Sequence, residues 1–186
     1  MNEFYELNVA GLTRALPVCP IGENLSIAGF VILGDIELTC RCAEELVKKA
    51  PEHDIIITAE TKGIPLVHEM TRLTGNKRCI IARKGQKLYM KDTISVNVKS
   101  ITTAGVQTLY ISADEIDMMR GKRVLIVDDV ISTGDSLKAI ELLVNKAGGE
   151  IVGKMAILAE GDAQERSDLI YLAPLPLLDG EGNVIK

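Results

Sequence analysis

The sequence contains no tryptophan, and aromatic residues make up only 3% of it. Hydrophobic residues still reach 47%, so the core must be built from aliphatic side chains, and 186 residues are enough to bury a large one. No apolar run reaches the roughly 20 residues that a membrane-spanning helix needs. The first residues also lack the basic and then apolar pattern of a secretory signal. We therefore expect a single α/β domain in the cytoplasm that does not contact membranes.

Metal-binding cysteine patterns and an excess of positive charge are absent too. The four cysteines form no Cys-x-x-Cys pair and no metal-like spacing with either histidine, which predicts reduced thiols, as in the cytosol. The net charge is −5, which argues against a general nucleic-acid-binding surface. An anionic small molecule would then be held by a local cluster of Lys and Arg side chains and by a metal ion.

An apolar stretch in the second half of the chain, Val124–Val127, is typical of a buried strand, and we expect it to end on Asp128 and Asp129. Adjacent carboxylates at a strand end could hold sugar hydroxyls, either directly or through Mg²⁺. Alone, these residues also fit an ordinary strand with a solvated acidic end. Response-regulator receiver domains open on a similar pattern, but they need a longer chain after it than this sequence has.

The turn after this strand has the features of a phosphate site. Backbone N–H groups at a helix N-terminus favour an anion, and the hydroxyls of Ser132, Thr133 and Ser136 add donors. Gly134 allows a close backbone approach or a positive φ, and we expect Asp135 or Ser136 to cap the helix that follows. An acid pair followed by such a turn predicts a site for a ribose 5-phosphate.

This segment resembles the phosphoribosyl-diphosphate (PRPP) signature of the type I phosphoribosyltransferases. The shared pattern is an apolar strand, Asp-Asp, two apolar residues, a small residue with Thr-Gly, and a Ser or Thr. The resemblance implies that Asp128 and Asp129 are catalytic and hold the ribose or Mg²⁺, the latter directly or through water. It implies a 5-phosphate site at Ser132, Thr133, Gly134, Asp135 and Ser136.

Strands and helices alternate along the chain, which predicts a mostly parallel, doubly wound sheet with helices on both faces and ligands at the carboxyl ends of its strands. The expected strands are Asp54–Ala59, Arg78–Ala82 and Ile151–Leu158, besides the one that precedes Asp128. Asp35 is expected to cap a helix that runs to about Ala50, and a second helix starts with Pro65 and runs to about Leu73.

The family resemblance divides one phosphoribosyltransferase domain, residues 1–186, into three parts. The core is expected at 34–159, and a small hood that binds the base is expected from the terminal segments 4–33 and 160–186. A mobile hairpin lid is expected at about 88–110, because residues 93–99 and 106–111 alternate like hairpin arms.

Two further loops resemble diphosphate-binding segments of the family. Glu60, Thr61, Lys62 and Gly63 follow a predicted strand, and the resemblance implies a non-proline cis peptide between Glu60 and Thr61. Arg83, Lys84 and Lys87 resemble the segment that leads into the lid, which in many members reaches the neighbouring subunit. The resemblance therefore implies a homodimer, with Arg83 and Lys87 among the catalytic residues, although a charge run alone is usually a solvated surface.

The terminal segments and the Arg-Lys segment bear on which base is bound. Leu25, Ile27, Ala28, Phe30 and Glu160 are expected to contact a flat ring in the hood, although each could instead belong to a plain hydrophobic subdomain. The Arg-Lys segment and Glu160 resemble adenine and xanthine enzymes most, so we expect PRPP and a purine base, adenine first, as substrates. Xanthine or orotate transfer and non-catalytic PRPP or purine sensing are the alternatives. No nucleic-acid partner is expected.

Overall fold

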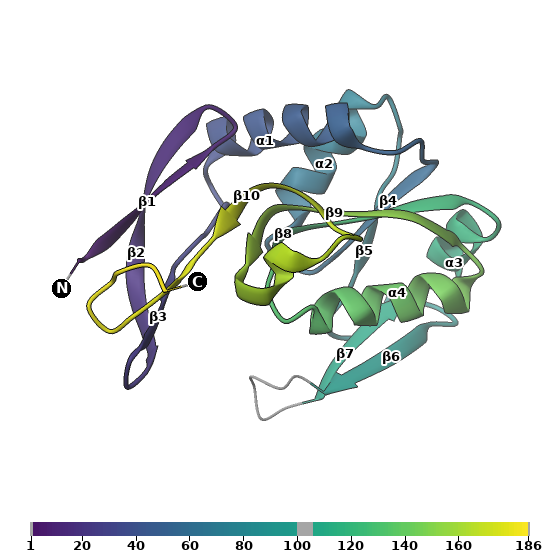
Figure 1. Cartoon of the computed structure of the whole chain (residues 1–186). Helices are drawn as coiled ribbons and strands as arrows, with labels where there is room; N and C mark the ends of the chain where they lie inside the picture. Colours follow the sequence, from purple (N-terminus) through teal and green to yellow (C-terminus); the bar gives the residue numbers. More distant parts are fainter. Residues whose placement is uncertain (1, 100–105, 186) are drawn as a thin grey trace.

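The computed structural model describes residues 2–99 and 106–185. Its centre is a sheet of five parallel strands in the order β10-β9-β8-β4-β5 (Figure 1). The strands are β4 (Ile55–Ala59), β5 (Ile80–Ala82), β8 (Arg123–Ile131), β9 (Glu150–Glu160) and β10 (Ile170–Leu175). All their pairings are parallel, so their carboxyl ends lie at one edge of the sheet.

Helices cover both faces of this sheet, as Figure 1 shows. Buried side chains of α1 (Ile36–Lys49) and α2 (Ile64–Leu73) pack with Leu125 and Val127 of β8. Buried side chains of α4 (Asp135–Ala147) and α3 (Ala113–Met119) pack with Val124 and Ile126. Since successive residues of β8 thus enter opposite cores, the predicted doubly wound α/β fold is confirmed.

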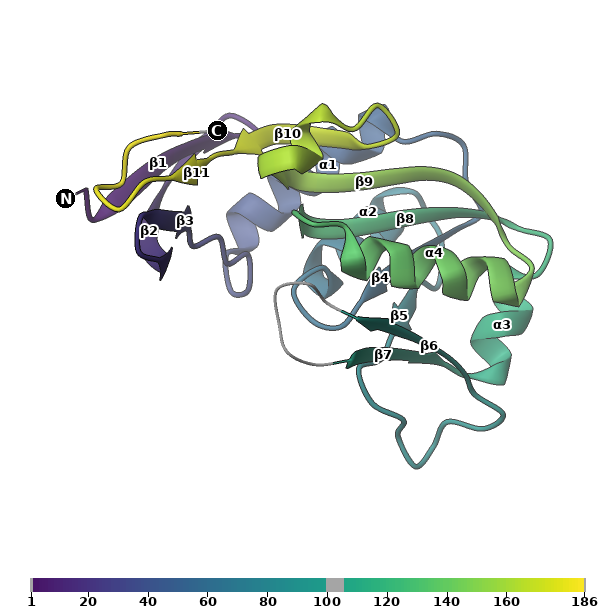
Figure 2. The same cartoon turned by 60° about the horizontal axis from the view of Figure 1, so that its bottom comes forward.

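A second, antiparallel sheet with the order β1-β2-β3-β11 stands beside the main sheet and contains both ends of the described chain (Figures 1 and 2). Its strands are β1 (Phe4–Val9), β2 (Leu12–Gly22), β3 (Leu25–Ala28) and β11 (Leu177–Leu178). We call this sheet the hood. The segment after Glu160 is shared between the two sheets, because residues 170–175 form β10 of the main sheet and β11 joins the hood.

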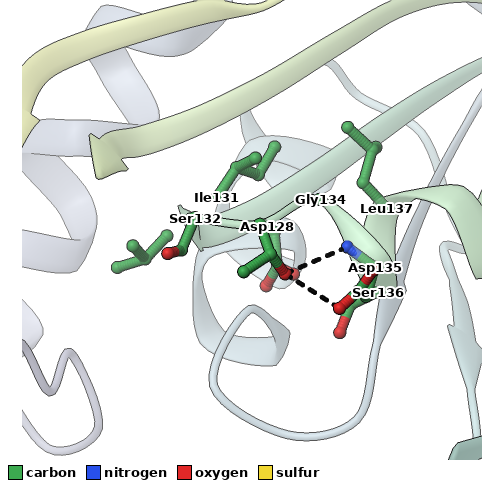
Figure 3. Close-up of a pocket in the computed structure, with 9 residues that line it drawn as sticks. Asp128, Ile131, Ser132, Gly134, Asp135, Ser136 and Leu137 are labelled. Atoms are coloured by element: carbon green, nitrogen blue, oxygen red, sulfur yellow. Dashed lines mark hydrogen bonds between the residues drawn. The ribbon is translucent and has the colours of Figure 1, made fainter. Parts of the chain in front are cut away.

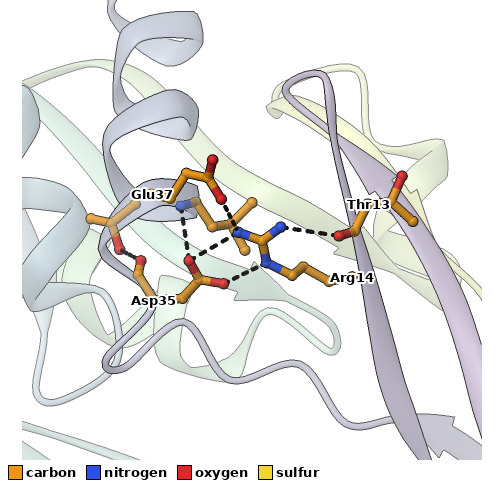
Figure 4. A network of polar contacts seen from close by, with 6 residues as sticks. Thr13, Arg14, Asp35 and Glu37 are labelled. Atoms are coloured by element: carbon orange, nitrogen blue, oxygen red, sulfur yellow. Dashed lines mark hydrogen bonds and ion pairs between the residues drawn. The ribbon is translucent and has the colours of Figure 1, made fainter.

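An ionic network fastens the hood to the first helix (Figure 4). Arg14 of β2 donates from Nε to Asp35 Oδ2 at 2.6 Å and from Nη2 to Glu37 Oε2 at 2.8 Å. Asp35 also accepts the Leu38 N–H at 3.0 Å, so it caps α1 as predicted. The guanidinium of Arg14 holds the pKa of Asp35 below its usual value.

The expected hairpin arms are β6 (Ile94–Lys99) and β7 (Val106–Ile111), which pair antiparallel below α4 (Figure 2). The middle of the expected lid, residues 100–105, lies outside the described residues. Arg83 and Tyr110 form a bridge that joins this hairpin to the chain after β5. No described helix combines the length and the apolar character needed to cross a lipid bilayer.

Two local expectations about the signature segment were wrong. The strand does not end at Asp128 and Asp129, because β8 pairs with β9 as far as Ile131. The helix is capped neither by Asp135 nor by Ser136: α4 begins at Asp135, and Gly134 is its N-cap at φ +82°, without a side-chain cap. A left-handed conformation at the N-cap is readily adopted only by glycine, which explains Gly134 at this position.

Candidate functional site

The register of the sheet brings the predicted site segments to one edge. Ala59 of β4 pairs with Ala82 of β5, so the turns that follow these strands start side by side. Ile57 of β4 pairs with Ile126 of β8, and two residues further along the strands Ala59 comes level with Asp128. The acid pair therefore lies next to both turns.

The turn from Ser132 to Ser136 lines a cavity of about 140 Å³ at the N-terminus of α4, and Asp128 lines its other side (Figure 3). Ser132 and Thr133 are exposed. The Thr133 hydroxyl donates to Asp135 Oδ2 at 3.0 Å and accepts the Asp135 N–H at 3.4 Å. The cavity therefore lies at the N-terminus of a helix, where the helix dipole favours an anion.

The two carboxylates of the acid pair have different surroundings. Asp129 is 3% exposed, and its Oδ2 lies 3.0 Å from Lys62 Nζ. Asp128 is half-buried, and its Oδ1 accepts the backbone N–H of Asp129 at 2.9 Å. Burial and, after it, the neighbouring Asp129 carboxylate raise the pKa of Asp128. A cation or a hydroxyl-rich ligand at this position would stabilise the ionised form of Asp128.

The acid pair has the chemistry of a Mg²⁺ site that the substrate completes. Mg²⁺ prefers oxygen ligands and is usually held by one or two carboxylates together with phosphate oxygens and water. Asp129 Oδ2 is buried, and among the described residues it accepts no hydrogen bond and has Lys62 as its ion-pair partner. Across residues 2–99 and 106–185 no three His, Cys, Asp or Glu side chains are grouped to hold a metal ion by themselves. These residues therefore suit a Mg²⁺ ion that is held by two carboxylates and by oxygens of the substrate, rather than one held by protein side chains alone.

The turn after β4 is held against the chain that follows β5. The peptide between Glu60 and Thr61 is cis, which confirms the prediction for this bond. Glu60 Oε2 accepts the backbone N–H of Lys84 at 2.9 Å, and Glu60 Oε1 lies 3.8 Å from Arg83 Nη1. One carboxylate therefore fixes two neighbouring loops relative to each other.

Gly63, at the start of α2, is required by a close approach. A Cβ atom at this position would lie 2.3 Å from Thr58 Oγ1 and 3.0 Å from Asp128 Oδ1. Thr58 is fully buried in β4, so it cannot move aside. Any side chain at residue 63 would push apart the turn and the acid pair.

A second cavity of about 400 Å³ joins the two parts of the site. It is bounded by the turn after β4, the Lys84 side of the β5 loop and the acid pair. It shares Asp128, Val130 and Ser136 with the smaller cavity at the helix N-terminus. The edge of the sheet thus has two adjoining cavities, with one turn at each end and two carboxylates between the turns.

Some predicted site residues lie elsewhere. The side chain of Lys87 is exposed, and it lines neither of the two cavities. Of the five predicted base contacts, Ala28 and Phe30 are buried in the core cluster beneath the hood. Leu25, Ile27 and Glu160 are partly exposed, and none of the five lines the two cavities at the sheet edge. Phe30 does border a separate cavity of about 340 Å³ between β2 and α1.

One residue at this edge was not predicted from the sequence. Arg166 follows the short 3₁₀ helix Gly161–Glu165, and its Nη1 lies 3.1 Å from the position of a Cβ on Gly134. The side chain reaches the turn because β9 runs parallel to β8, so that the chain after β9 starts beside the turn that follows β8. Thr58 was missed for a different reason, because a threonine in a β-branched strand looks like any other core residue.

Comparisons with known proteins agree with this geometry. The family model of the phosphoribosyl transferase domain matches residues 36–172. A hypoxanthine/guanine phosphoribosyltransferase of Methanotorris igneus is 32% identical over 148 residues, which cover 78% of this chain and 73% of the relative. An adenine phosphoribosyltransferase of a Thermotoga species is 36% identical over 129 residues, which cover 69% and 67%. The crystal structure of the adenine phosphoribosyltransferase from Thermoanaerobacter pseudethanolicus superposes with a TM-score of 0.69 at 22% identity, covering 86% of this chain and 95% of that one.

Proposed function

Since this chain belongs to the phosphoribosyl transferase family and is a purine phosphoribosyltransferase, we propose that adenine is the base it prefers. PRPP and adenine would give the nucleoside 5′-monophosphate and diphosphate, as in purine salvage. The single observation that carries PRPP as the ribose donor is the pair of adjoining cavities at the sheet edge, with a turn suited to an anion at each end and Asp128 and Asp129 between them. This order of groups matches 5-phosphate, ribose and diphosphate.

The chain's own residues would hold the two reactants and would supply no nucleophile. The turn from Ser132 to Ser136 would bind the 5-phosphate, and Lys62 with the backbone of its turn would bind the diphosphate. Glu60 would keep Arg83 and Lys84 beside that group. As the bond between ribose C1 and the diphosphate oxygen breaks, this fixed arrangement stabilises the departing charge while N9 of the base attacks the opposite face.

Mg²⁺ would be held by Asp128 and Asp129, directly or through water, and when bound it neutralises charge on the diphosphate and ribose oxygens. Until PRPP binds, Lys62 partly fills this role for Asp129. We further propose a homodimer and a cytoplasmic location. Arg83 precedes the hairpin expected to act as a lid, and in many members this segment reaches the neighbouring subunit.

Sequence features favour adenine over hypoxanthine or guanine. Enzymes for the latter bases usually carry Glu-Asp at the acid pair, an Asp where this chain has Ser132, and a Lys near the end of the last strand. This chain has Asp128 and Asp129 at the acid pair, and β9 ends in Glu160. Its identity to an adenine relative, at 36%, is close to the 32% for a hypoxanthine/guanine relative. Activity measurements must therefore decide the base.

The deciding experiment measures diphosphate release from Mg-PRPP with adenine, hypoxanthine, guanine, xanthine and orotate in parallel, and identifies each nucleotide formed. We expect the highest kcat/KM with adenine. A higher kcat/KM with hypoxanthine or guanine would overturn the base assignment and leave purine transfer intact. Binding of PRPP or purine without turnover of any base would assign a sensing role instead.

A further inference from the structure

Arg166 lies against the turn that we assign to the 5-phosphate. A Cβ on Gly134 would lie 3.1 Å from Arg166 Nη1, so the guanidinium sits directly against the N-cap of α4. In Figure 1 the chain after β9 lies beside the first residues of α4, in agreement with the short distance between Arg166 and Gly134. Arg166 is separated from this turn by a helix and a strand, and no signature motif includes it.

The orientation of Arg166 is fixed by a paired carboxylate. Its Nε and Nη2 donate to the two oxygens of Asp168 at 3.0 and 2.9 Å, which is a bidentate arrangement. Because these two nitrogens lie on one edge of the planar guanidinium, Nη1 is on the far corner and faces Gly134. The side chain is 32% exposed, so ligand can reach it from the solvent side.

The same network ties Arg166 to the body of α4. Asp168 also accepts from Lys154 Nζ at 2.8 Å, and Lys154 Nζ lies 2.5 Å from Glu141 Oε1 on the helix. The alternating charges of Glu141, Lys154, Asp168 and Arg166 run from the middle of α4 to its N-terminus. The guanidinium is therefore held in place before any ligand arrives.

The turn needs a cation from outside its own sequence. Residues 132–136 contain Asp135 and no Lys or Arg, and Asp128 borders the same cavity. A phosphate monoester carries about −1.5 to −2 charge at neutral pH. The N-terminus of a helix offsets only about half of one elementary charge. A cation from another segment would therefore favour the 5-phosphate at this turn.

We propose that Arg166 binds the 5-phosphate through Nη1 and supplies the positive charge that the turn itself lacks. This inference rests on the proposed function, because it takes the turn as the 5-phosphate site. The group recognised is the phosphate monoester shared by PRPP and a nucleoside 5′-monophosphate. Free diphosphate, which would bind at the Lys62 turn, does not need Arg166.

The test compares ligands that carry or lack the 5-phosphate. We expect Arg166→Gln to weaken PRPP and adenosine 5′-monophosphate by the same factor, about 10- to 100-fold, the value of one charged hydrogen bond. Affinities for adenosine and diphosphate should stay unchanged. Arg166→Lys, which keeps the charge and loses the fork, should give an intermediate loss. Arg120→Gln is the matched control, because Arg120 is an exposed arginine paired with Asp117 on α3.

Phosphorus NMR of bound adenosine 5′-monophosphate distinguishes a direct contact between Arg166 and the phosphate from a merely structural role of Arg166. Arg166 favours the dianion, so the pKa of the bound phosphate should rise in Arg166→Gln and should not move in Arg120→Gln. An Arg166→Gln variant that binds adenosine 5′-monophosphate as wild type does overturns this inference. Should that variant fail to fold, an Arg166→Lys variant with wild-type affinity overturns it equally. A wild-type protein that binds neither PRPP nor the monophosphate overturns the proposed function as well, which keeps the two failures distinct.

Discussion

The edge of the main sheet that we assign to PRPP and the hood differ in how far apart in sequence their contacting segments lie. At the edge, the turn of Ser132 to Ser136 and the turn of Glu60 to Gly63 are each a few consecutive residues. In the hood, Ile27 pairs with Leu177, and Asn2 donates its N–H to Glu181 near the other end of the chain. One region is assembled from local segments and the other from both termini.

This difference has a physical cause. Phosphate and diphosphate are bound by backbone N–H groups and charges, which a short turn can supply wherever a parallel strand ends. A flat base needs an apolar surface of a particular shape, and such a surface requires side chains from several strands. The hood is accordingly stabilised by tertiary contacts such as Arg14 with Asp35 and Glu37. We expect the edge to set PRPP affinity and the hood to set base affinity.

The largest expected effect tests the edge. Gly134→Val places a β-branched residue at φ +82° and against Arg166 Nη1, so it should distort the turn. The KM for PRPP should rise about 100-fold or more, as expected from losing two charged hydrogen bonds of about 1.5–3 kcal/mol each. The KM for the base should change little. Steady-state kinetics with each substrate varied in turn measure both values.

Gly148→Val is the matched control for that variant. Gly148 ends the same helix at φ +75°, where a Cβ would meet only Arg120 Cγ at 3.7 Å. The backbone strain is similar, and no ligand group is nearby. Its melting temperature should fall about as much as that of Gly134→Val, while PRPP kinetics stay normal. An unchanged PRPP KM in Gly134→Val would remove the turn from the site.

A somewhat smaller effect is expected at the acid pair. Asp128→Asn and Asp129→Asn keep the side-chain shape and remove one charge, so each should lower kcat/KM about tenfold or more. Asp54→Asn is the control at the opposite end of the sheet, where Asp54 pairs with Arg123 at 2.8 Å. It should reduce thermal stability and leave kcat/KM unchanged. Wild-type turnover in both acid-pair variants would mean that these carboxylates are only part of a strand.

The diphosphate end can be separated from the phosphate end. Lys62→Ala should weaken diphosphate and PRPP about tenfold, because one charged contact is lost, and should leave the nucleoside monophosphate nearly unaffected. Arg166→Gln should show the opposite pattern for two of these ligands, because it should weaken the monophosphate and leave diphosphate unaffected. Lys48→Ala, which removes an exposed lysine paired with Glu45 on α1, is the control. Equal weakening of all three ligands would contradict two distinct anion sites and would point to the loss of the Lys62 pair with Asp129.

The parts of the fold and the site that could be predicted from the sequence are those formed by local segments. The strand-helix alternation predicted the parallel sheet, and the pattern around Asp128 predicted the turn at α4. The N-cap was misjudged because Asp135 is a good capping residue by type, while the turn geometry needs glycine at residue 134. The strand was read as too short because Asp128 and Asp129 interrupt its apolar run, although pairing with β9 continues past them.

Contacts between distant segments could not be predicted. Residues 170–175 were expected in the hood but form β10 of the main sheet, at its edge, where Pro174 is tolerated. The pair of Arg166 with Asp168 beside Gly134 depends on how the chain after β9 folds back, which no local pattern encodes. The roles of Leu25 and Ile27 toward a base stay predictions for the same reason.

The smallest effect is expected in the hood. Arg14→Leu removes the ion pairs with Asp35 and Glu37, so β2 should be held less firmly against α1. We expect the KM for the base to rise a few-fold, the KM for PRPP to stay the same, and the melting temperature to fall by a few degrees. Arg41→Leu removes an exposed pair with Glu44 on the same helix and should change none of these values.

The pH dependence of the fall in melting temperature in Arg14→Leu tests whether the lost ion pair with Asp35 causes it. Hydrogen bonds from Arg14 hold the pKa of Asp35 below its ordinary value. A lowered carboxyl pKa gives stability that is fully present above the unfolded value of about 3.9 and is lost as the pH falls through the folded value. The difference in melting temperature between wild type and Arg14→Leu should therefore be constant from pH 5 to 8, within the range where Asp35 is ionised in both states. It should narrow below about pH 4. A difference in melting temperature that does not change with acidification would show that the pair with Asp35 is not its cause. A PRPP affinity that falls together with the base affinity would show that the hood and the edge do not bind the two substrates separately.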